Sequence, residues 1–302
     1  MEPRPMVTPP DPRRPVALHE QLEETDRGLV YDLSTLLDRR QILKLAGFTT
    51  ISAGLMSIVG CAPGTSSSAT SSTAASAAAS ASTAAGSAAA ADCAIIPEET
   101  AGPFPGDGSN GPNVLAQSGI VRPDIRSSFG SSTTTAKGVP LTIKLTIQDA
   151  TNGCTPMDGA AVYLWHCDQA GNYSLYSQAA ANENYLRGVQ AADGNGLVTF
   201  QSIFPACYQG RWPHIHFEVY PDLEAATDES NKIATSQIAL PKESCDLVYA
   251  TDGYAQSVQN LSQITLASDN VFRDDSAVRQ LGTVTGTVEA GLTVTAVIPV
   301  NT

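Results

Sequence analysis

The sequence predicts an all-β fold, a β-sandwich with a Greek-key-like core and long loops, preceded by a disordered leash. The clearest observation is segment 139–148, where apolar and polar residues alternate with the period of two expected for a half-buried strand. Further segments are rich in β-branched and aromatic residues and are separated by turn residues such as those at 193–196. These segments are 160–167, 197–204, 214–220 and 292–300. No long amphipathic helix competes with them, and we expect segment 245–280 to be loop with a short helix.

The composition supports a globular core and disfavours some partners. Hydrophobic residues make up 42% of the 302 residues and charged residues 16%, which excludes a wholly disordered chain. The 17 Lys and Arg against 30 Asp and Glu give a net charge of −13, which would repel phosphate backbones and anionic lipid surfaces. We therefore expect no nucleic-acid partner.

The N-terminal segment 1–61 is typical of an export signal. Two adjacent arginines, Arg39 and Arg40, are followed by two apolar residues and a lysine, which matches the twin-arginine (Tat) pattern. The mildly apolar stretch 45–60 is too short and too weak for a comfortable spanning helix. It ends at Cys61 in a sequence that resembles a bacterial lipobox. We predict a twin-arginine lipoprotein-type signal; a plain secretory signal with an incidental cysteine is the alternative.

Segment 62–91 contains only Ala, Ser, Thr, Gly and Pro, a composition that cannot bury a core and predicts a flexible linker. The folded domain is therefore expected at 92–302. The whole arrangement predicts an exported protein, periplasmic or at the cell surface, that meets a membrane only through a lipid at Cys61.

Five cysteines lie in the predicted domain, at positions 93, 154, 167, 207 and 245. An oxidising compartment favours disulfides, but an odd number leaves at least one thiol unpaired within the chain. Their spacing does not give the pairing.

One predicted strand contains two histidines, His214 and His216, separated by a single residue. Since successive side chains of a strand point to opposite faces, the two imidazoles share one face, and Ile215, Phe217 and Val219 share the other. We expect the apolar face to point into the core. Two imidazoles about 7 Å apart, at roughly 3.3 Å per residue, can converge on one metal ion. Two polar side chains on a solvated face are the alternative.

Histidine is scarce, because the chain has 4 histidines and only His166 remains in the predicted domain besides this pair. Further ligands must therefore be His166, for which a packed role is the simpler explanation, or oxygen and sulfur donors. Tyr173 and Tyr208 are candidate oxygen donors. A phenol has a pKa of about 10, so that tyrosinate suits a strong Lewis acid such as ferric iron at neutral pH. Packed or interfacial tyrosines are the alternative.

Several short motifs occur in a characteristic order, the last of them leading into Arg211 and the histidine pair. They are the segments 100–104, 122–125, 161–168, 171–174, 186–188 and 204–208. In this order they resemble the intradiol ring-cleavage dioxygenases, and among them the secreted branch that is similar to protocatechuate dioxygenase. The resemblance extends over roughly residues 95 to 220.

The resemblance implies a mononuclear, non-haem ferric site with Tyr173, Tyr208, His214 and His216 as ligands. It also implies that Arg211 lies beside the substrate, where a guanidinium can stabilise developing negative charge. The implied substrates are a small catecholic molecule and dioxygen. The ring would be cleaved between its two hydroxyl-bearing carbons to a muconate-type dicarboxylic acid, and its further substituents are left open.

By the same resemblance, Arg187 and Gln190 lie in a segment that borders the pocket and are candidates for supporting the ligands from behind. Tyr208 is the phenolate that leaves the metal and accepts a proton. Cys207 precedes this tyrosine. A thiol so close to ferric iron would be prone to oxidation unless it is paired, so a disulfide through Cys207 is expected.

Two other readings remain open at the level of the sequence. One is a cell-surface β-sandwich binding lipoprotein without catalysis, in which the histidines are structural. The other is a copper or zinc hydrolase that uses His166 together with His214 and His216.

Overall fold

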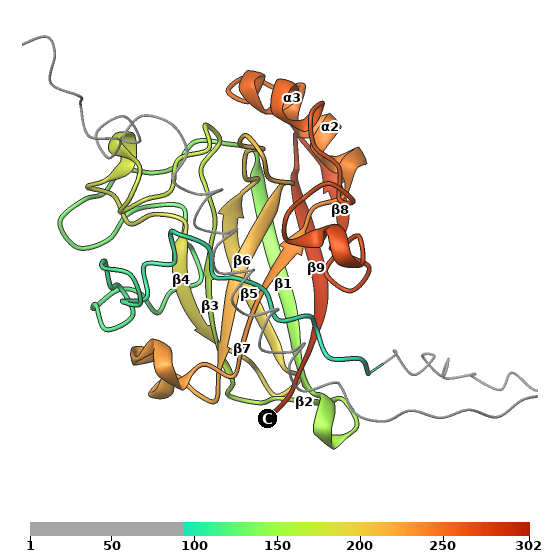
Figure 1. Ribbon diagram of the computed structural model, residues 1–302. Helices are drawn as coiled ribbons and strands as arrows, with labels where there is room; N and C mark the ends of the chain where they lie inside the picture. The colour runs from blue at the N-terminus through green and yellow to red at the C-terminus, as the bar shows by residue number, and fades with distance from the viewer. Residues whose placement is uncertain (1–92) are drawn as a thin grey trace, which may run out of the picture.

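The computed structural model describes residues 93–302; the predicted signal at 1–61 and the predicted linker at 62–91 lie outside these residues. The described part consists of two β-sheets packed against each other, with long loops and two short helices around them (Figure 1). The predicted β-sandwich is confirmed. Within residues 93–302, no helix is long and apolar enough to cross a membrane.

The first sheet is organised around β1, which pairs with β5 on one side and, in parallel, with β9 on the other. Its strands are β1 (Pro140–Asp149), β2 (Thr155–Pro156), β5 (Leu197–Ile203), β8 (Thr283–Thr287) and β9 (Gly291–Val300). The second sheet is antiparallel throughout, in the order β4-β3-β6-β7. Its strands are β3 (Ala161–Trp165), β4 (Arg187–Ala191), β6 (His214–Tyr220) and β7 (Ala234–Ala239).

Apolar side chains from both sheets meet between them and form the main core. Fully buried members include Ile143, Leu145, Phe200 and Val294 from the first sheet and Ile215, Phe217 and Ile238 from the second. Each such side chain stabilises the fold by roughly 1.5–3 kcal/mol relative to an exposed one.

A second apolar cluster lies on the opposite face of the second sheet, the face that points away from the first sheet. It includes Tyr163 and Trp165 of β3 and Tyr220 of β6, together with Val114 and Leu115 from the loops before β1. Every residue of β6 is buried as a consequence. Long loops therefore cover this outer face.

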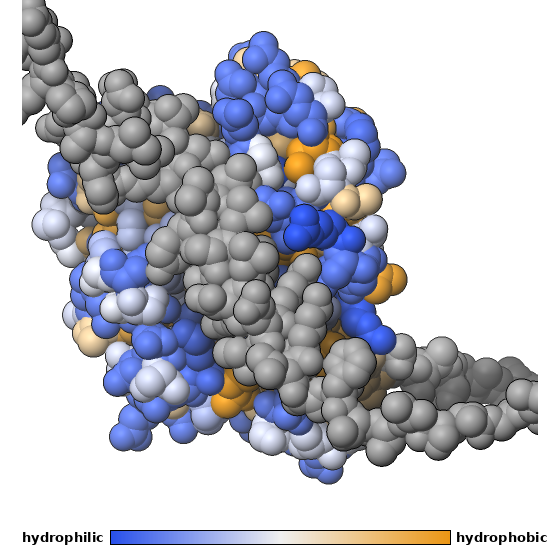
Figure 2. Space-filling view, in the orientation of Figure 1, coloured by the Kyte–Doolittle hydropathy of each residue, from blue (hydrophilic) through white to orange (hydrophobic). Residues whose placement is uncertain are grey.

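The five predicted strands are β1, β3, β5, β6 and β9, with ends that differ by one or two residues. The sequence did not predict β2, β4, β7 and β8. The segment expected to hold one short helix instead contains α2 (Lys242–Tyr249) and α3 (Ala255–Leu261), which lie at one end of the sandwich (Figure 1). Their visible surface is mainly hydrophilic (Figure 2).

An extended segment at 94–107, which we call the N-terminal strap, runs across the second sheet (Figure 1). The backbone N–H of Ile96 donates to the carbonyl of Pro299 on β9 at 2.9 Å, and that of Glu99 donates to Thr235 on β7 at 2.8 Å. The strap thus covers the edge of β7, which would otherwise present unpaired backbone groups.

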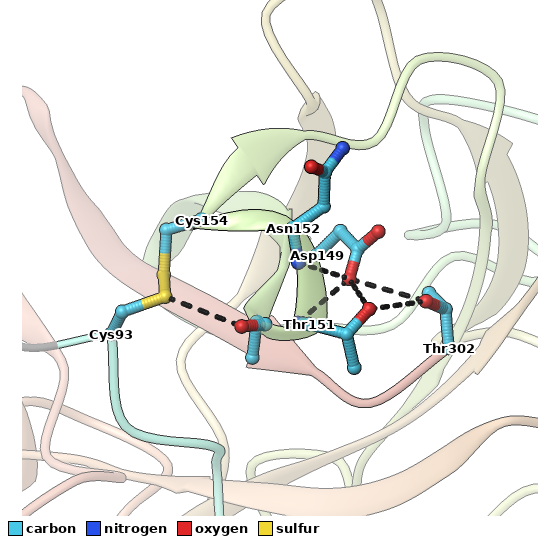
Figure 3. The surroundings of a disulfide bond; sticks show 7 residues. Cys93, Asp149, Thr151, Asn152, Cys154 and Thr302 are labelled. Atoms are coloured by element: carbon cyan, nitrogen blue, oxygen red, sulfur yellow. Dashed lines mark hydrogen bonds between the residues drawn. A yellow bond between two sulfur atoms is a disulfide. The ribbon is translucent and has the colours of Figure 1, made fainter.

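A disulfide between Cys93 and Cys154 joins the first described residue to the turn after β1. Beside it, Asp149 Oδ1 accepts hydrogen bonds from the backbone N–H of Thr151 at 2.9 Å and from Thr302 Oγ1 at 3.1 Å (Figure 3). The two ends of the described chain are therefore both tied to the same turn.

Replacing Cys93 and Cys154 together by serine is expected to lower the free energy of unfolding by about 4 kcal/mol, because the bond closes a loop of 61 residues. Urea denaturation of the oxidised protein and of the variant measures this difference. Wild-type protein treated with a reductant should match the variant. A difference below about 1 kcal/mol would contradict the prediction.

Glu99 of the strap has a buried side chain, and its Oε1 accepts a hydrogen bond from Gln280 Nε2 at 3.3 Å. Burial raises the pKa of Glu99 to about 8, and the carboxylate of Asp274 adds to this shift. The charge of Arg211 and the hydrogen bond from Gln280 oppose it only in part. Glu99 is therefore protonated in the folded protein at neutral pH.

The contribution of Glu99 to stability is expected to fall as the pH rises from about 4.5 to about 8. In this window the folded protein keeps a proton that the unfolded chain has released, so raising the pH favours unfolding. Glu99→Gln cannot ionise, and the free energy of unfolding of this variant relative to wild type should therefore increase with pH across the window. Urea titrations at several pH values measure it. A difference that stays constant at every pH would refute the assignment.

Candidate metal centre

Four side chains meet on the outer face of the second sheet, beneath the loops that cover it. His214 and His216 come from β6, Tyr173 follows the turn at 168–172, and Tyr208 lies in the loop between β5 and β6. Tyr173 Oη and Tyr208 Oη lie 3.4 and 3.3 Å from His214 Nε2. The Nε2 atoms of the two imidazoles are 3.1 Å apart. The structure thus brings together the four residues that were predicted as metal ligands.

The alternation of β6 places the two imidazoles as predicted. Ile215 and Phe217 belong to the core between the sheets, and the histidines point to the other face. The ring of His216 stacks on Trp165 of β3, with centroids 4.9 Å apart and planes 5° apart. The alternative of a solvated face is wrong, because His214 and His216 are only 2% and 3% exposed.

The turn that carries Tyr173 packs tightly against Tyr208. Asp168 Oδ1 accepts a hydrogen bond from the backbone N–H of Asn172 at 2.9 Å, which closes the turn. Gly171 in this turn has a φ of 89°, and a Cβ there would lie 3.3 Å from Tyr208 Cβ. Glycine thus allows both the left-handed backbone and the close approach of the two tyrosine-bearing loops.

Burial dominates the electrostatics of the four side chains. It lowers the pKa of His214 to about 3, and the nearby charge of Arg211 lowers it as well. Burial raises the pKa of Tyr173 well above its ordinary value, and the Tyr208 phenol adds to this shift. Without a cation the cluster therefore consists of neutral imidazoles and a protonated Tyr173 phenol.

The donor set fits a metal cation. His214 Nδ1 lies 2.5 Å from the carbonyl oxygen of Trp212, which can only accept a hydrogen bond, so Nε2 carries the lone pair. Both phenol oxygens and His216 Nε2 approach this one lone pair, which cannot satisfy all three. Among residues 93–302, His216 Nδ1 is buried without a hydrogen-bond partner. A cation among the four atoms would be contacted by a lone pair from each of them.

Tyrosine oxygens are needed for such a site. Within residues 93–302, no group of three or more His, Cys, Asp and Glu side chains is placed to hold a metal ion. Hard phenolate oxygens together with imidazole nitrogens suit ferric iron. The two phenols also differ, since Tyr173 is 3% exposed whereas Tyr208 is half-buried.

Arg211 lies in the loop before β6 and is 3% exposed. Its Nε donates to Asp269 Oδ2 at 3.0 Å, and its Nη2 donates to Gln237 Oε1 at 2.6 Å. The ion pair between Arg211 and Asp269 is buried. The charge of Arg211 nevertheless acts on the site, since it contributes to the lowered pKa of both His214 and His216.

Arg187 of β4 is 1% exposed and ties the N-terminal strap to the loop that carries Tyr173. Its Nη2 donates to the carbonyls of Phe104 and Ser174 at 2.9 and 3.0 Å, and its Nη1 donates to that of Pro105 at 2.6 Å. This side chain therefore holds the surroundings of the site through backbone carbonyls.

Gln190 does not border the site. It lies opposite Val162 on β3, whose side chain belongs to the core between the sheets, whereas Val189 belongs to the outer cluster. Strand alternation therefore turns Gln190 away from the imidazoles. The expectation that this residue lines the pocket is corrected by the geometry.

Residues 111–229 match the protein-family model described as Dioxygenase. The fold is similar to that of an intradiol ring-cleavage dioxygenase from Tetranychus urticae, with a TM-score of 0.53 and 24% identity over 69% of this chain and 95% of that chain. Residues 111–229 thus match the dioxygenase family, and the fold is that of an intradiol ring-cleavage dioxygenase. A second dioxygenase crystal structure has a TM-score of 0.55 and 23% identity, and it covers 70% of this chain and 95% of that chain.

A chlorocatechol 1,2-dioxygenase from Rhodococcus opacus is 38% identical to this chain over 55 residues. The matched segment amounts to 18% of this chain and 21% of that enzyme. The chain therefore aligns with only about a fifth of that relative's length.

In this intradiol dioxygenase domain, His166 is packed away from the four-residue cluster. Its Nε2 lies 2.6 Å from Ser202 Oγ, and its Nδ1 lies 2.8 Å from the carbonyl oxygen of Cys167. Burial lowers the pKa of His166 to about 4. The packed role is confirmed, and a site built from three histidines is not supported.

Among the cysteines at 93–302, Cys207 does not form the expected disulfide. Its thiol is buried beside the backbone, with Sγ 3.5 Å from the carbonyl oxygen of Arg211, and Cys167 and Cys245 are likewise free and buried. Burial raises the pKa of Cys207 to about 12, which keeps the thiol protonated and unreactive.

Sequence reasoning missed Asp269 and Gln237, the two acceptors that hold Arg211. Gln237 stands in a strand that was not predicted, and Asp269 stands in a polar stretch without periodicity. No local pattern marks either residue.

His166→Ala is expected to leave metal binding intact while lowering the free energy of unfolding by about 1–3 kcal/mol, because Ser202 Oγ loses its buried partner. Metal analysis of purified protein and urea denaturation measure the two effects. His214→Ala is the comparison, since it should abolish metal binding. Loss of iron from His166→Ala would restore the three-histidine reading.

Proposed function

We propose that this protein is a non-haem Fe(III) dioxygenase that cleaves a catecholic ring between its two hydroxyl-bearing carbons to a muconate-type dicarboxylic acid. One observation carries the proposal: two phenol oxygens and two imidazole nitrogens converge in a buried site of an intradiol dioxygenase fold. Dioxygen supplies both added oxygen atoms and is the oxidant, so the reaction needs no external reductant.

Tyr173, Tyr208, His214 and His216 would hold the ferric ion. When bound, the ion supplies Lewis acidity that favours the deprotonated catechol. Tyr173, His214 and His216 are buried, and burial holds both imidazoles neutral, the form that binds metals.

Tyr208 is assigned as the proton acceptor for a substrate hydroxyl. It is the more exposed of the two phenols, whereas Tyr173 is buried and packs on Phe104 with ring centroids 5.1 Å apart. Its Oη can therefore move and take up a proton at lower cost than the Tyr173 Oη.

Arg211 is assigned to stabilise negative charge on the bound substrate. Its guanidinium is buried and fixed by Asp269 and Gln237, so its charge is weakly screened and does not need to reorient during the reaction.

We also propose that the protein is exported and tethered by a lipid at Cys61, as the sequence motifs indicate. The Cys93–Cys154 disulfide supports this location, because disulfides persist in oxidising compartments and are rare in the cytosol. Labelling with a radioactive fatty acid tests the tether, with Cys61→Ser as the control.

Tyr208→Phe is expected to lower kcat on a catechol by about 100-fold or more, because the hydroxyl proton loses its acceptor. It should also bleach or shift the visible band of the red-brown ferric protein. Oxygen uptake, product mass and absorption spectra measure these effects over a panel of substituted catechols. Tyr176→Phe is a matched control, since this nearby phenol bonds Gly106 and Asn110 and is outside the cluster.

A wild-type protein that is colourless and iron-free after expression with ample iron would defeat the enzymatic proposal. It would favour the cell-surface binding protein without catalysis. Products that retain an intact ring would have the same consequence.

A further inference from the structure

The loop at 204–213, which carries Tyr208 and Arg211 and leads into His214, is held from outside by the segment 242–280. Five side chains of this segment bond the loop. They are Tyr249 and Tyr254, which donate to the carbonyls of Pro205 and Phe204; Ser257 and Asn260, which bond the backbone of Cys207; and Asp269. Segment 242–280, for most of which the sequence predicted loop with a short helix, therefore supports the site.

Among these five side chains, Asp269 makes the largest number of hydrogen bonds. It is fully buried, and every partner is a donor. Oδ2 accepts from Arg211 Nε at 3.0 Å and from the backbone N–H of Trp212 at 2.7 Å. Oδ1 accepts from the backbone N–H groups of Val271 and Phe272 at 2.8 and 3.1 Å. All its bonds need a carboxylate in one orientation.

Trp212 connects the Asp269 carboxylate to His214, one of the proposed metal ligands, through hydrogen bonds. Trp212 donates its N–H to Asp269, and its carbonyl oxygen accepts the Nδ1 proton of His214 at 2.5 Å. The indole Nε1 of Trp212 also donates to the carbonyl of Leu240 at 2.8 Å, so the residue is held on both sides. A shift of Trp212 would therefore alter the orientation and the tautomer of His214.

We propose that Asp269 is a positioning residue, which fixes the direction of the Arg211 guanidinium and, through Trp212, holds His214 with its Nε2 lone pair toward the cluster. The inference rests on the proposed function for its catalytic consequence. Its structural part, the tautomer of His214, does not depend on that function.

The test compares Asp269→Asn with wild type. An amide offers one acceptor oxygen where the carboxylate offers two, and its NH₂ group faces donors, so at least two of the four bonds are lost. We expect kcat/KM on catechol to fall about 10- to 100-fold with iron content retained, as is usual when a group that orients a metal ligand is removed. Asp274→Asn is the control, because this exposed carboxylate lies in the same segment.

A double-mutant cycle separates positioning from a general loss of stability. If Asp269 acts through Arg211, Asp269→Asn should cost less than about threefold in an Arg211→Lys background. Equal losses in both backgrounds would overturn this role. Asp269→Ser, which leaves room for a water molecule, provides the same cycle if the asparagine variant does not fold.

Nitrogen NMR of the metal-free protein gives a readout that is independent of turnover. Wild type should show His214 protonated at Nδ1, and Asp269→Asn should show a mixture of tautomers. An unchanged tautomer would overturn the link through Trp212. Wild-type protein that does not turn over any catechol would defeat the proposed function, and the tautomer measurement would still decide the inference.

Discussion

The alternation of side chains along β6 is the constraint on which the rest of the structure depends. One face of this strand carries apolar residues into the core between the sheets, and the other carries two imidazoles under a layer of loops. A shift of the register by one residue would exchange the two faces. The packing of the sandwich and the geometry of the site are therefore set together by one seven-residue strand.

The loops over the outer face of the second sheet complete the site, because they carry the two tyrosines. Two of them bring phenol oxygens to within 3.4 Å of His214 Nε2, and they can approach because Gly171 leaves space beside Tyr208. The result is a cluster in which three neighbouring atoms approach the one lone pair of His214 Nε2. Such a cluster is poorly satisfied by itself, and a bound cation resolves the conflict.

Strands were predictable where alternation or β-branched residues gave a local signal, as in β1 and β6. The missed strands lack that signal for physical reasons. β7 is buried throughout, but it consists of small and polar residues with a single isoleucine, so neither alternation nor an apolar run marks it. β8 is an exposed edge strand rich in threonine. Both strands form because of contacts with distant parts of the chain, and a single sequence does not reveal these contacts.

The four members of the cluster were predictable from motif order and residue type, and their convergence needed the fold. Gln190 was misplaced because proximity in sequence does not say which face of β4 a side chain takes. Asp269 had no signal at all, since Arg211 and Trp212 lie 58 and 57 residues away and its other partners are backbone N–H groups. Contacts of this kind depend on the shape of the chain and leave the local pattern unchanged.

The covalent link at Cys93 also has a mechanical consequence. A pull on the chain at this residue passes through the bond to Cys154 and into β1, the central strand of the first sheet. The disulfide thus offers a second covalent path for that load, beside the strap residues that bond β7 and Arg187. Tension at the N-terminal end is thereby diverted in part from the segment that covers the catalytic face.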